Sequence, residues 1–312
     1  MKILYALFIL FAFLFISCSQ SRVHKENFSG IKNINGEKIY CQTTGDGEED
    51  IVVVHGGPGL AHNYLMPHFK ELSDNYRLIY YDQRGSGLSE PLKKDELHLM
   101  DSMVSDLEGV RKAFNIEKMN LAGQSFGALI AINYALKYPQ NVKTLLLLEP
   151  APGKTEYIKD FSEEIVRRLS DRNKEILKRI VNSDEFSKFD PEAFKAFLRT
   201  RFKAYFKDTL LVNKVYLDYF DEQGVKKFFG SSKAFEPYFL NYDLYAGMGK
   251  INCPVLIIHG ALDPVPEEAV EKMASAIKGS ELHIIPGSGH FVHIENPQEY
   301  FSLIRSFLEK NN

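Results

Sequence analysis

The sequence predicts an α/β fold in which helices cover a mostly parallel, eight-stranded sheet. Short aliphatic runs typical of buried strands alternate with helical patterns along most of the chain, and this alternation is typical of parallel sheets with right-handed crossovers. The strand signal fades between residues 151 and 245, where helical patterns rich in aromatic and charged residues follow one another. We therefore expect a core, residues 28–150 and 246–312, interrupted by a helical cap at 151–245.

The expected strands are short, and the first two form a hairpin that adds antiparallel strands to the sheet. They lie at 28–31, 38–43, 51–54, 77–81, 118–122, 142–148, 254–259 and 281–285. The core helices are expected at 60–72, 97–114, 125–138, 267–277 and 297–309. The cap helices are expected at 161–169, 174–181, 191–206, 209–220 and 232–240.

Composition excludes several classes of function. The chain has 312 residues, of which 45% are hydrophobic and 25% charged, as in soluble globular proteins that bury a full core. Its net charge of −3 and the absence of a basic cluster argue against a nucleic-acid partner. We find no zinc-type spacing and expect neither a metal nor a cofactor.

Ser125 lies in the run Gly123-Gln-Ser-Phe-Gly127, which reads G-x-S-x-G. A strand pattern enters this run and a helical pattern leaves it, which is the context of a nucleophile elbow. Such a sharp turn exposes the hydroxyl at a helix N-terminus, where backbone N–H groups stabilise negative charge. The sequence therefore predicts that Ser125 is a catalytic nucleophile.

A base and an orienting carboxylate are expected further along the chain, because a serine hydroxyl needs both to attack. Asp263 follows the strand at 254–259, and His290 lies in a Gly-rich loop after the strand at 281–285. Both positions fall at the same edge of the sheet. Glu149, at the end of another strand, is the alternative acid. His293 is the rival base, although it is expected to pack at the start of the last helix.

The run His55-Gly-Gly-Pro-Gly59 follows the buried strand at 51–54. Glycine here lets the backbone approach a substrate oxygen, so the N–H groups of Gly57 and Phe126 are expected to form an oxyanion hole. A later run, Asp82-Gln-Arg-Gly-Ser-Gly-Leu-Ser89, follows the strand at 77–81. We expect Asp82 and Arg84 to form a structural ion pair that braces the loops beside the site.

At these motifs the chain resembles the proline iminopeptidase group of α/β-hydrolases, serine aminopeptidases that remove N-terminal residues from peptides. The resemblance covers about residues 28–150 and 246–310. It implies the α/β-hydrolase fold, with Ser125 as nucleophile, His290 as base and Asp263 as orienter. One departure is Phe126, where family members often carry Trp or Tyr after the nucleophile.

Members of the group bind the substrate ammonium through cap glutamates. The resemblance makes Glu236 and Glu222 candidates for this role here, with Glu149 as a third. We expect an aminopeptidase that releases N-terminal residues through an acyl-enzyme. A carboxylesterase or lactonase is the alternative, because the same triad cleaves esters. The substrate is then a small peptide or ester. An epoxide hydrolase is disfavoured, because its elbow needs aspartate where this chain has Ser125.

The N-terminus predicts export. A positive start is followed by an apolar run too short for a transmembrane helix and suited to a signal peptide. The run ends in Phe15-Ile-Ser-Cys18, which looks like a bacterial lipobox, so residues 1–17 would be removed and Cys18 lipidated. Residues 18–27 would form a tether to a membrane of the bacterial cell envelope, facing the periplasm or exterior. Cys41 and Cys253 are expected to be buried thiols rather than a disulfide.

Overall fold

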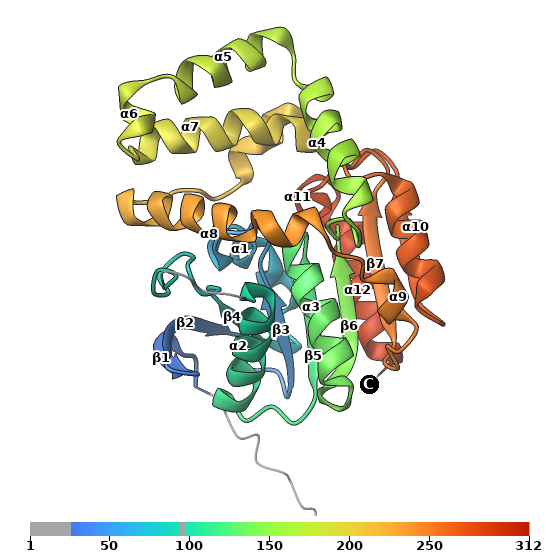
Figure 1. Ribbon diagram of the computed structural model, residues 1–312. Helices are drawn as coiled ribbons and strands as arrows, with labels where there is room; N and C mark the ends of the chain where they lie inside the picture. Colours follow the sequence, from blue (N-terminus) through green and yellow to red (C-terminus); the bar gives the residue numbers. More distant parts are fainter. Residues whose placement is uncertain (1–25, 94–97, 312) are drawn as a thin grey trace, which may run out of the picture.

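The computed structural model describes residues 26–93 and 98–311, and they form a sheet with helices on both faces and a helical layer above it (Figure 1). The eight strands run in the order β1-β2-β4-β3-β5-β6-β7-β8. Strand β2 pairs antiparallel with β1 and β4, and the other pairs are parallel. The strands are β1 Ser29–Ile34, β2 Glu37–Thr44, β3 Glu49–Val54, β4 Tyr76–Tyr81, β5 Met119–Gln124, β6 Val142–Leu148, β7 Val255–Gly260 and β8 Glu281–Ile285. The predicted fold class is confirmed.

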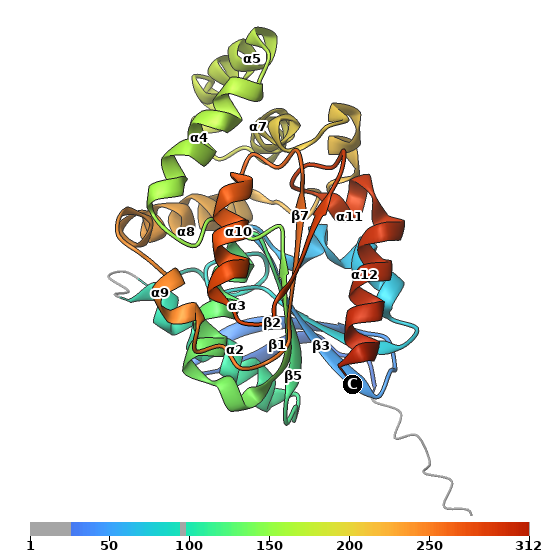
Figure 2. The same cartoon turned by 90° about the vertical axis from the view of Figure 1, so that its right-hand side faces the viewer.

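Alternate residues of each central strand enter different cores, because successive side chains of a strand point to opposite faces. In β3, Ile51 and Val53 join a cluster with residues of α1 and α12, whereas Val52 and Val54 join a cluster with α2, α3 and α10. Figure 2 shows α12 on one side of the sheet and α2, α3 and α10 on the other. The helices are α1 Met66–Phe69, α2 Leu99–Ala113, α3 Phe126–Lys137, α9 Tyr245–Met248, α10 Glu267–Ala276, α11 Val292–Glu295 and α12 Pro297–Lys310.

The helix expected at 60–72 is broken. The segment forms a 3-10 turn, the single-turn helix α1 and a second 3-10 turn. Pro67 stands at the start of α1, where its missing N–H is tolerated but where it cannot extend a helix from the preceding turn.

The cap lies between β6 and β7 in the sequence and above the core in Figure 1. Its elements are α4 Glu156–Arg168, α5 Asp171–Val181, α6 Asp184–Ser187, α7 Pro191–Phe202, the 3-10 turns η4 Lys203–Tyr205 and η5 Thr209–Lys214, and α8 Glu222–Leu240. Aromatic rings hold it together: Phe194 packs edge-on against Phe220 at 4.8 Å and Phe228 at 4.9 Å between ring centroids. Such pairs stabilise a core beyond the area they bury.

Two cap predictions were wrong. The helix expected at 209–220 is the 3-10 turn η5 followed by irregular chain. Helix α8 begins at Glu222 rather than at 232, because the Asp221 carboxylate accepts a hydrogen bond of 2.7 Å from the Gly224 N–H and caps the helix. Gly230, Ser231 and Ser232, at the expected start, lie inside this helix.

The predicted signal peptide and Cys18 lie outside the described residues, as does most of the tether. Within 26–93 and 98–311, no helix combines the length and apolar character that a membrane span needs. Cys41 and Cys253 are free thiols, and burial raises their pKa values to about 12 and about 11.

Candidate active site

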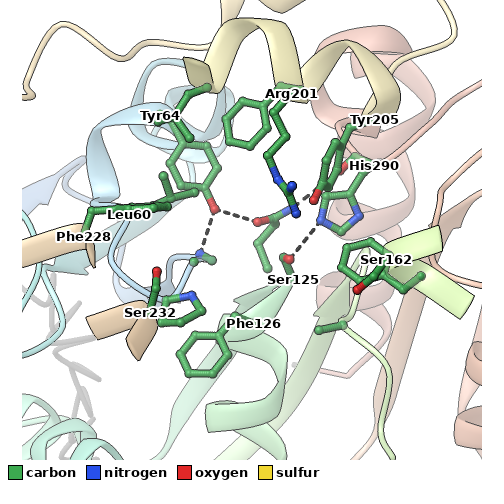
Figure 3. A pocket seen from close by; sticks show the side chains of 18 of the residues that line it. Leu60, Tyr64, Ser125, Phe126, Ser162, Arg201, Tyr205, Phe228, Ser232 and His290 are labelled. Atoms are coloured by element: carbon green, nitrogen blue, oxygen red, sulfur yellow. Dashed lines mark hydrogen bonds between the residues drawn. The ribbon is translucent and has the colours of Figure 1, made fainter. Parts of the chain in front are cut away.

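Ser125 occupies a strained turn between β5 and α3, with φ 53° and ψ −119°. The turn closes only because glycines flank it. A Cβ on Gly123 would lie 2.5 Å from the Gly127 carbonyl oxygen, and one on Gly127 would overlap the Val54 carbonyl oxygen. This crowding is the physical reason for the G-x-S-x-G pattern. The result is a serine hydroxyl that projects from the sheet edge into a cavity (Figure 3).

The structure brings the three residues of the predicted triad together. His290 Nε2 lies 2.9 Å from Ser125 Oγ, and His290 Nδ1 lies 2.7 Å from Asp263 Oδ2. Asp263 follows β7 and His290 follows β8, so two neighbouring parallel strands deliver both side chains to the edge where Ser125 emerges. The imidazole can therefore take the serine proton while the carboxylate holds the ring in place.

Asp263 stays ionised although it is buried. Burial alone would raise the pKa of its carboxyl, but His290 and His259 and the hydrogen bonds from His290 and the Val265 N–H lower it below the ordinary value. His259 Nδ1 lies 3.6 Å from the same carboxylate. The charge needed beside an imidazolium is thus present before the reaction starts.

The predicted oxyanion loop lies against the nucleophile. A Cβ on Gly56 would meet Ser125 Cβ at 3.0 Å, so only glycine lets the loop approach this closely. The Phe126 N–H is the first of α3 and has no intrahelical acceptor. It is therefore free to donate a hydrogen bond to an oxyanion, as is expected of the Gly57 N–H.

Sequence reasoning missed the side chains that fix this loop. Tyr64 Oη accepts a hydrogen bond of 2.7 Å from the Gly56 N–H and donates one of 2.6 Å to Gln124 Oε1 (Figure 3). This bridge joins the glycine loop to the residue before Ser125. Gln124 stood inside the quoted motif, but no pattern in the sequence pointed to Tyr64.

The cap braces the histidine loop. The Tyr205 carbonyl oxygen accepts the His290 N–H at 2.7 Å, and the two rings pack edge-on at 5.2 Å. Glu295 accepts hydrogen bonds from the N–H groups of Gly289 at 2.6 Å, Lys207 at 2.8 Å and Asp208 at 3.2 Å. A single carboxylate on α11 therefore ties the histidine loop to the cap, a link that no sequence signal revealed.

The cavity above Ser125 has a volume of about 370 Å³ and lies between core and cap. Its walls are mostly aromatic and aliphatic, as in many small-molecule sites. Among the described residues that line it, Arg201 is the only one with a permanent charge, and His290 is the only other basic side chain. Other lining residues include Gly57, Tyr64, Gln124, Ser125, Phe126, Ile158, Phe161, Phe197, Phe202, Tyr205, Phe228, Phe229, Phe239 and Phe291.

Comparison with known proteins places the fold in a family. A family model described as the alpha/beta hydrolase fold matches residues 51–297. The chain belongs to the α/β-hydrolase family. Among curated relatives, a proline iminopeptidase of Saccharolobus solfataricus is 29% identical over 90% of this chain and 92% of its own length. The resemblance to the proline iminopeptidase group is thus confirmed, and the chain is a serine hydrolase of the α/β type.

Solved structures of low identity share the fold. Proline iminopeptidase of Mycobacterium smegmatis aligns with a TM-score of 0.66 and 20% identity over 91% of this chain and 98% of its own. A protein described as the N-acyl homoserine lactone degrading enzyme Est816 aligns with a TM-score of 0.64 and 21% identity over 89% and 99%. The α/β-hydrolase fold therefore leaves the substrate open.

The cap glutamates do not reach the cavity of this α/β-hydrolase. Glu222 is exposed near the start of α8 and pairs with Lys226 one turn away. Glu236 is exposed on the same helix, because it follows the buried Phe235 and successive helical residues point about 100° apart. Neither lines the cavity, so the expectation that they bind the substrate ammonium there is corrected.

Glu149 is fully buried after β6 and faces Gln124 without a hydrogen bond of normal geometry. Burial raises the pKa of its carboxyl well above the ordinary value, and the negative charge of Asp263 raises it further. A neutral acid enclosed behind the site does not pair with a substrate ammonium in the cavity. The expectation for Glu149 as a binding residue, or as the triad acid, is likewise corrected.

Three further side chains have structural partners. Arg84 forms a two-bond ion pair with Asp106, at 2.7 and 2.8 Å, rather than with Asp82 as expected. Asp82 instead accepts hydrogen bonds from the backbone and ring nitrogens of His62, at 3.0 and 2.8 Å. His293 is buried in α11, and burial lowers its pKa well below the ordinary value. It packs on Phe69 away from Ser125.

Proposed function

We propose that the protein hydrolyses a small amide or ester through an acyl-enzyme on Ser125. The observation that carries this proposal is the unbroken hydrogen-bonded series from Ser125 through His290 to Asp263 at the floor of the cavity. Ser125 Oγ would attack the carbonyl carbon while its proton passes to His290 Nε2. His290 would then protonate the leaving group, and water would release the acyl group by the same steps.

Negative charge on the substrate oxygen would be stabilised by the N–H groups of Gly57 and Phe126. These donors are fixed before substrate binds, by the glycine loop and by the start of α3. Donors that need no reorganisation contribute much of the rate enhancement in acyl transfer. The Tyr64 bridge holds the loop in this arrangement.

The acyl group is proposed to be the N-terminal residue of a peptide, as in an aminopeptidase of the proline iminopeptidase kind. Support comes from the curated relatives, which match nearly the whole chain. The apolar walls beside Ser125 suit a compact apolar residue such as proline.

A carboxylesterase or lactonase is the second candidate, and one observation favours it. No aspartate or glutamate is among the described residues that line the cavity, whereas a bound α-ammonium normally pairs with a carboxylate. An ester carries no ammonium and needs no such partner.

Two substrate panels distinguish these candidates in one purified sample. Aminoacyl naphthylamides with a free or an N-acetylated amine test the peptidase, and para-nitrophenyl esters of increasing acyl length test the esterase. Turnover confined to free-amine naphthylamides would establish the aminopeptidase. Turnover of esters alone, or equal turnover of free and acetylated amides, would contradict it.

The nucleophile is tested separately from the substrate. A fluorophosphonate probe should label the wild type and fail to label Ser125→Ala, with the fold of the variant checked by circular dichroism. Loss of the nucleophile should lower kcat on the order of 10⁴-fold or more. Labelling that persists in the variant would contradict the assignment.

We also propose that the protein acts outside the cytoplasm, held to a membrane of the cell envelope by a lipid on Cys18. The support is the apolar N-terminal run followed by Phe15-Ile-Ser-Cys18. The residues that would carry out the chemistry all belong to the folded part that follows.

A further inference from the structure

Arg201 carries the one permanent charge among the described residues that line the cavity. It lies near the end of α7, and Figure 3 shows its side chain pointing down from the cap toward Ser125 and His290. The surrounding walls are aromatic, aliphatic or uncharged polar. A guanidinium in such surroundings attracts an anion more strongly than a surface arginine does, because less water screens it.

The helix aims Arg201 into the cavity. Residues one turn apart on α7 and on the 3-10 turn that follows share one face, and this face forms the roof of the cavity. Its members are Phe197, Leu198, Arg201, Phe202 and Tyr205. Arg199, two residues before Arg201, points to a different side of the helix and does not line the cavity.

Arg201 lacks a carboxylate partner among the described residues, unlike two other cap arginines, Arg199 and Arg168. Arg199 lies 3.5 Å from Asp218, and Arg168 lies 2.7 Å from Glu164. In the described part of the chain, no carboxylate forms an ion pair with Arg201. Its guanidinium instead interacts with the Tyr205 hydroxyl, whose pKa is raised by burial and held down in part by that positive charge. The N–H donors of Arg201 that do not bind Tyr205 are therefore available to an anionic ligand.

The guanidinium lies on the side of the cavity that holds His290. Arg201 interacts with Tyr205, and the Tyr205 ring packs on His290 at 5.2 Å. His290 is the group that would hand a proton to the leaving group. The oxyanion donors at Gly57 and Phe126 belong to other loops, from β3 and β5.

We propose that Arg201 binds a carboxylate carried by the leaving group of the substrate. This inference rests on the proposed acyl-enzyme function of Ser125 and deepens it. For a peptide substrate the carboxylate is the C-terminal one, which makes the substrates short peptides, since a cavity of about 370 Å³ holds roughly two or three residues. A guanidinium suits this task because its paired N–H groups match the two carboxylate oxygens.

The test compares two matched pairs of substrates. In the leaving-group pair, the dipeptide Pro-Phe carries a free carboxylate and prolyl-phenylalanine amide does not. In the acyl-side pair, the para-nitrophenyl monoester of glutaric acid is compared with that of its monoamide. Values of kcat/KM are measured for wild type, Arg201→Met, Arg201→Lys and the control Arg199→Met.

In the wild type, the free dipeptide should exceed its amide in kcat/KM by about 30-fold or more, as expected for a charge pair in a partly desolvated site. This ratio should fall toward one in Arg201→Met and stay unchanged in Arg199→Met. It should be partly retained in Arg201→Lys, which keeps the positive charge but not the paired N–H donors of the guanidinium.

Three outcomes decide between the inference and the proposed function. If the wild type reacts with fluorophosphonate but its ratio of kcat/KM for the free dipeptide to that for the amide is near one, the role of Arg201 is overturned and that of Ser125 stands. A preference found only in the acyl-side pair would overturn the leaving-group assignment. A wild type that does not react with fluorophosphonate would instead overturn the proposed function.

Discussion

Glu149 and Asp263 follow neighbouring strands, β6 and β7, and both carboxyl groups are buried, yet their pKa values move in opposite directions. Burial disfavours the charged form of each. Asp263 has His290 and His259 beside it, and the interactions with these two side chains, with the hydrogen bonds from His290 and the Val265 N–H, outweigh the burial. At Glu149, no cation is among the main influences within the part of the chain that the structure describes, and the negative charge of Asp263 raises its pKa further. The pKa values of two buried carboxyl groups thus shift in opposite directions because their neighbours differ.

Glu149→Gln is expected to stabilise the fold at neutral and alkaline pH. The carboxyl is neutral when folded but ionises above about 4.5 when unfolded, so the wild type loses stability as the pH rises from that value toward the raised folded pKa. Gln has no proton to lose. The stability gain of the variant should be near zero below pH 4.5 and grow by up to about 1.4 kcal/mol per pH unit above it.

Urea unfolding of both proteins at several pH values measures this gain. Glu222→Gln is the control, because Glu222 is exposed and its change should be small at every pH. Parallel pH profiles for wild type and Glu149→Gln would show that the buried carboxyl is ionised in the folded protein.

Among the secondary-structure elements, the four-residue helix α11 links the histidine loop to the cap. Through Glu295 it holds three backbone N–H groups, one in the histidine loop and two in the cap segment after η4. Burial raises the pKa of this carboxyl, while the three donors oppose the shift. The element therefore positions His290 relative to Ser125, although none of its residues lines the cavity.

Glu295→Gln should lower both activity and stability. The amide leaves one acceptor oxygen and places an NH2 group against backbone donors, which should cost about 1.5–3 kcal/mol of unfolding free energy. A displaced His290 should lower kcat by about 10- to 100-fold with little change in KM. Steady-state kinetics well below the unfolding temperature and thermal unfolding measure the two effects.

The control is Glu299→Gln, whose carboxylate bonds Asn296 at the surface and whose loss should change stability by less than about 0.5 kcal/mol. If Glu295→Gln kept the wild-type kcat, the link from α11 to the histidine loop would have no catalytic value. If only its stability fell, the role of Glu295 would be structural.

At the scale of the whole molecule, the core was predictable and the cap was not. Ser125, Asp263 and His290 each follow a strand of the parallel part of the sheet, and the carboxyl ends of parallel strands meet at one edge, so local patterns were enough to predict that they meet. In the cap, helical periodicity indicated helices but not how they pack. Phe235 and Glu236 are adjacent in sequence, yet only the former turns toward Phe126.

The same reason explains why Arg201 was missed. From sequence alone, a single arginine in a cap helix is interpreted as a solvent-exposed charge unless the helix face that meets the core is known. Which face that is depends on contacts between α7 and distant segments such as the loop at His290. Such long-range packing has no short sequence signature, so the residues proposed to select the substrate emerged only from the three-dimensional arrangement.

Location is the remaining property of the whole molecule, and Cys18→Ser tests it. We expect the wild type in the membrane fraction with fatty acid incorporated, and the variant without lipid and released from membranes wherever its signal peptide is still cleaved. The multiple acyl chains of a lipoprotein bind a bilayer firmly, whereas one chain binds only marginally. Because the residues that form the site lie within 26–311, kcat/KM on a soluble substrate should stay within about two-fold. A wild-type protein recovered without lipid, with an N-terminus well past Cys18, would contradict the lipid anchor.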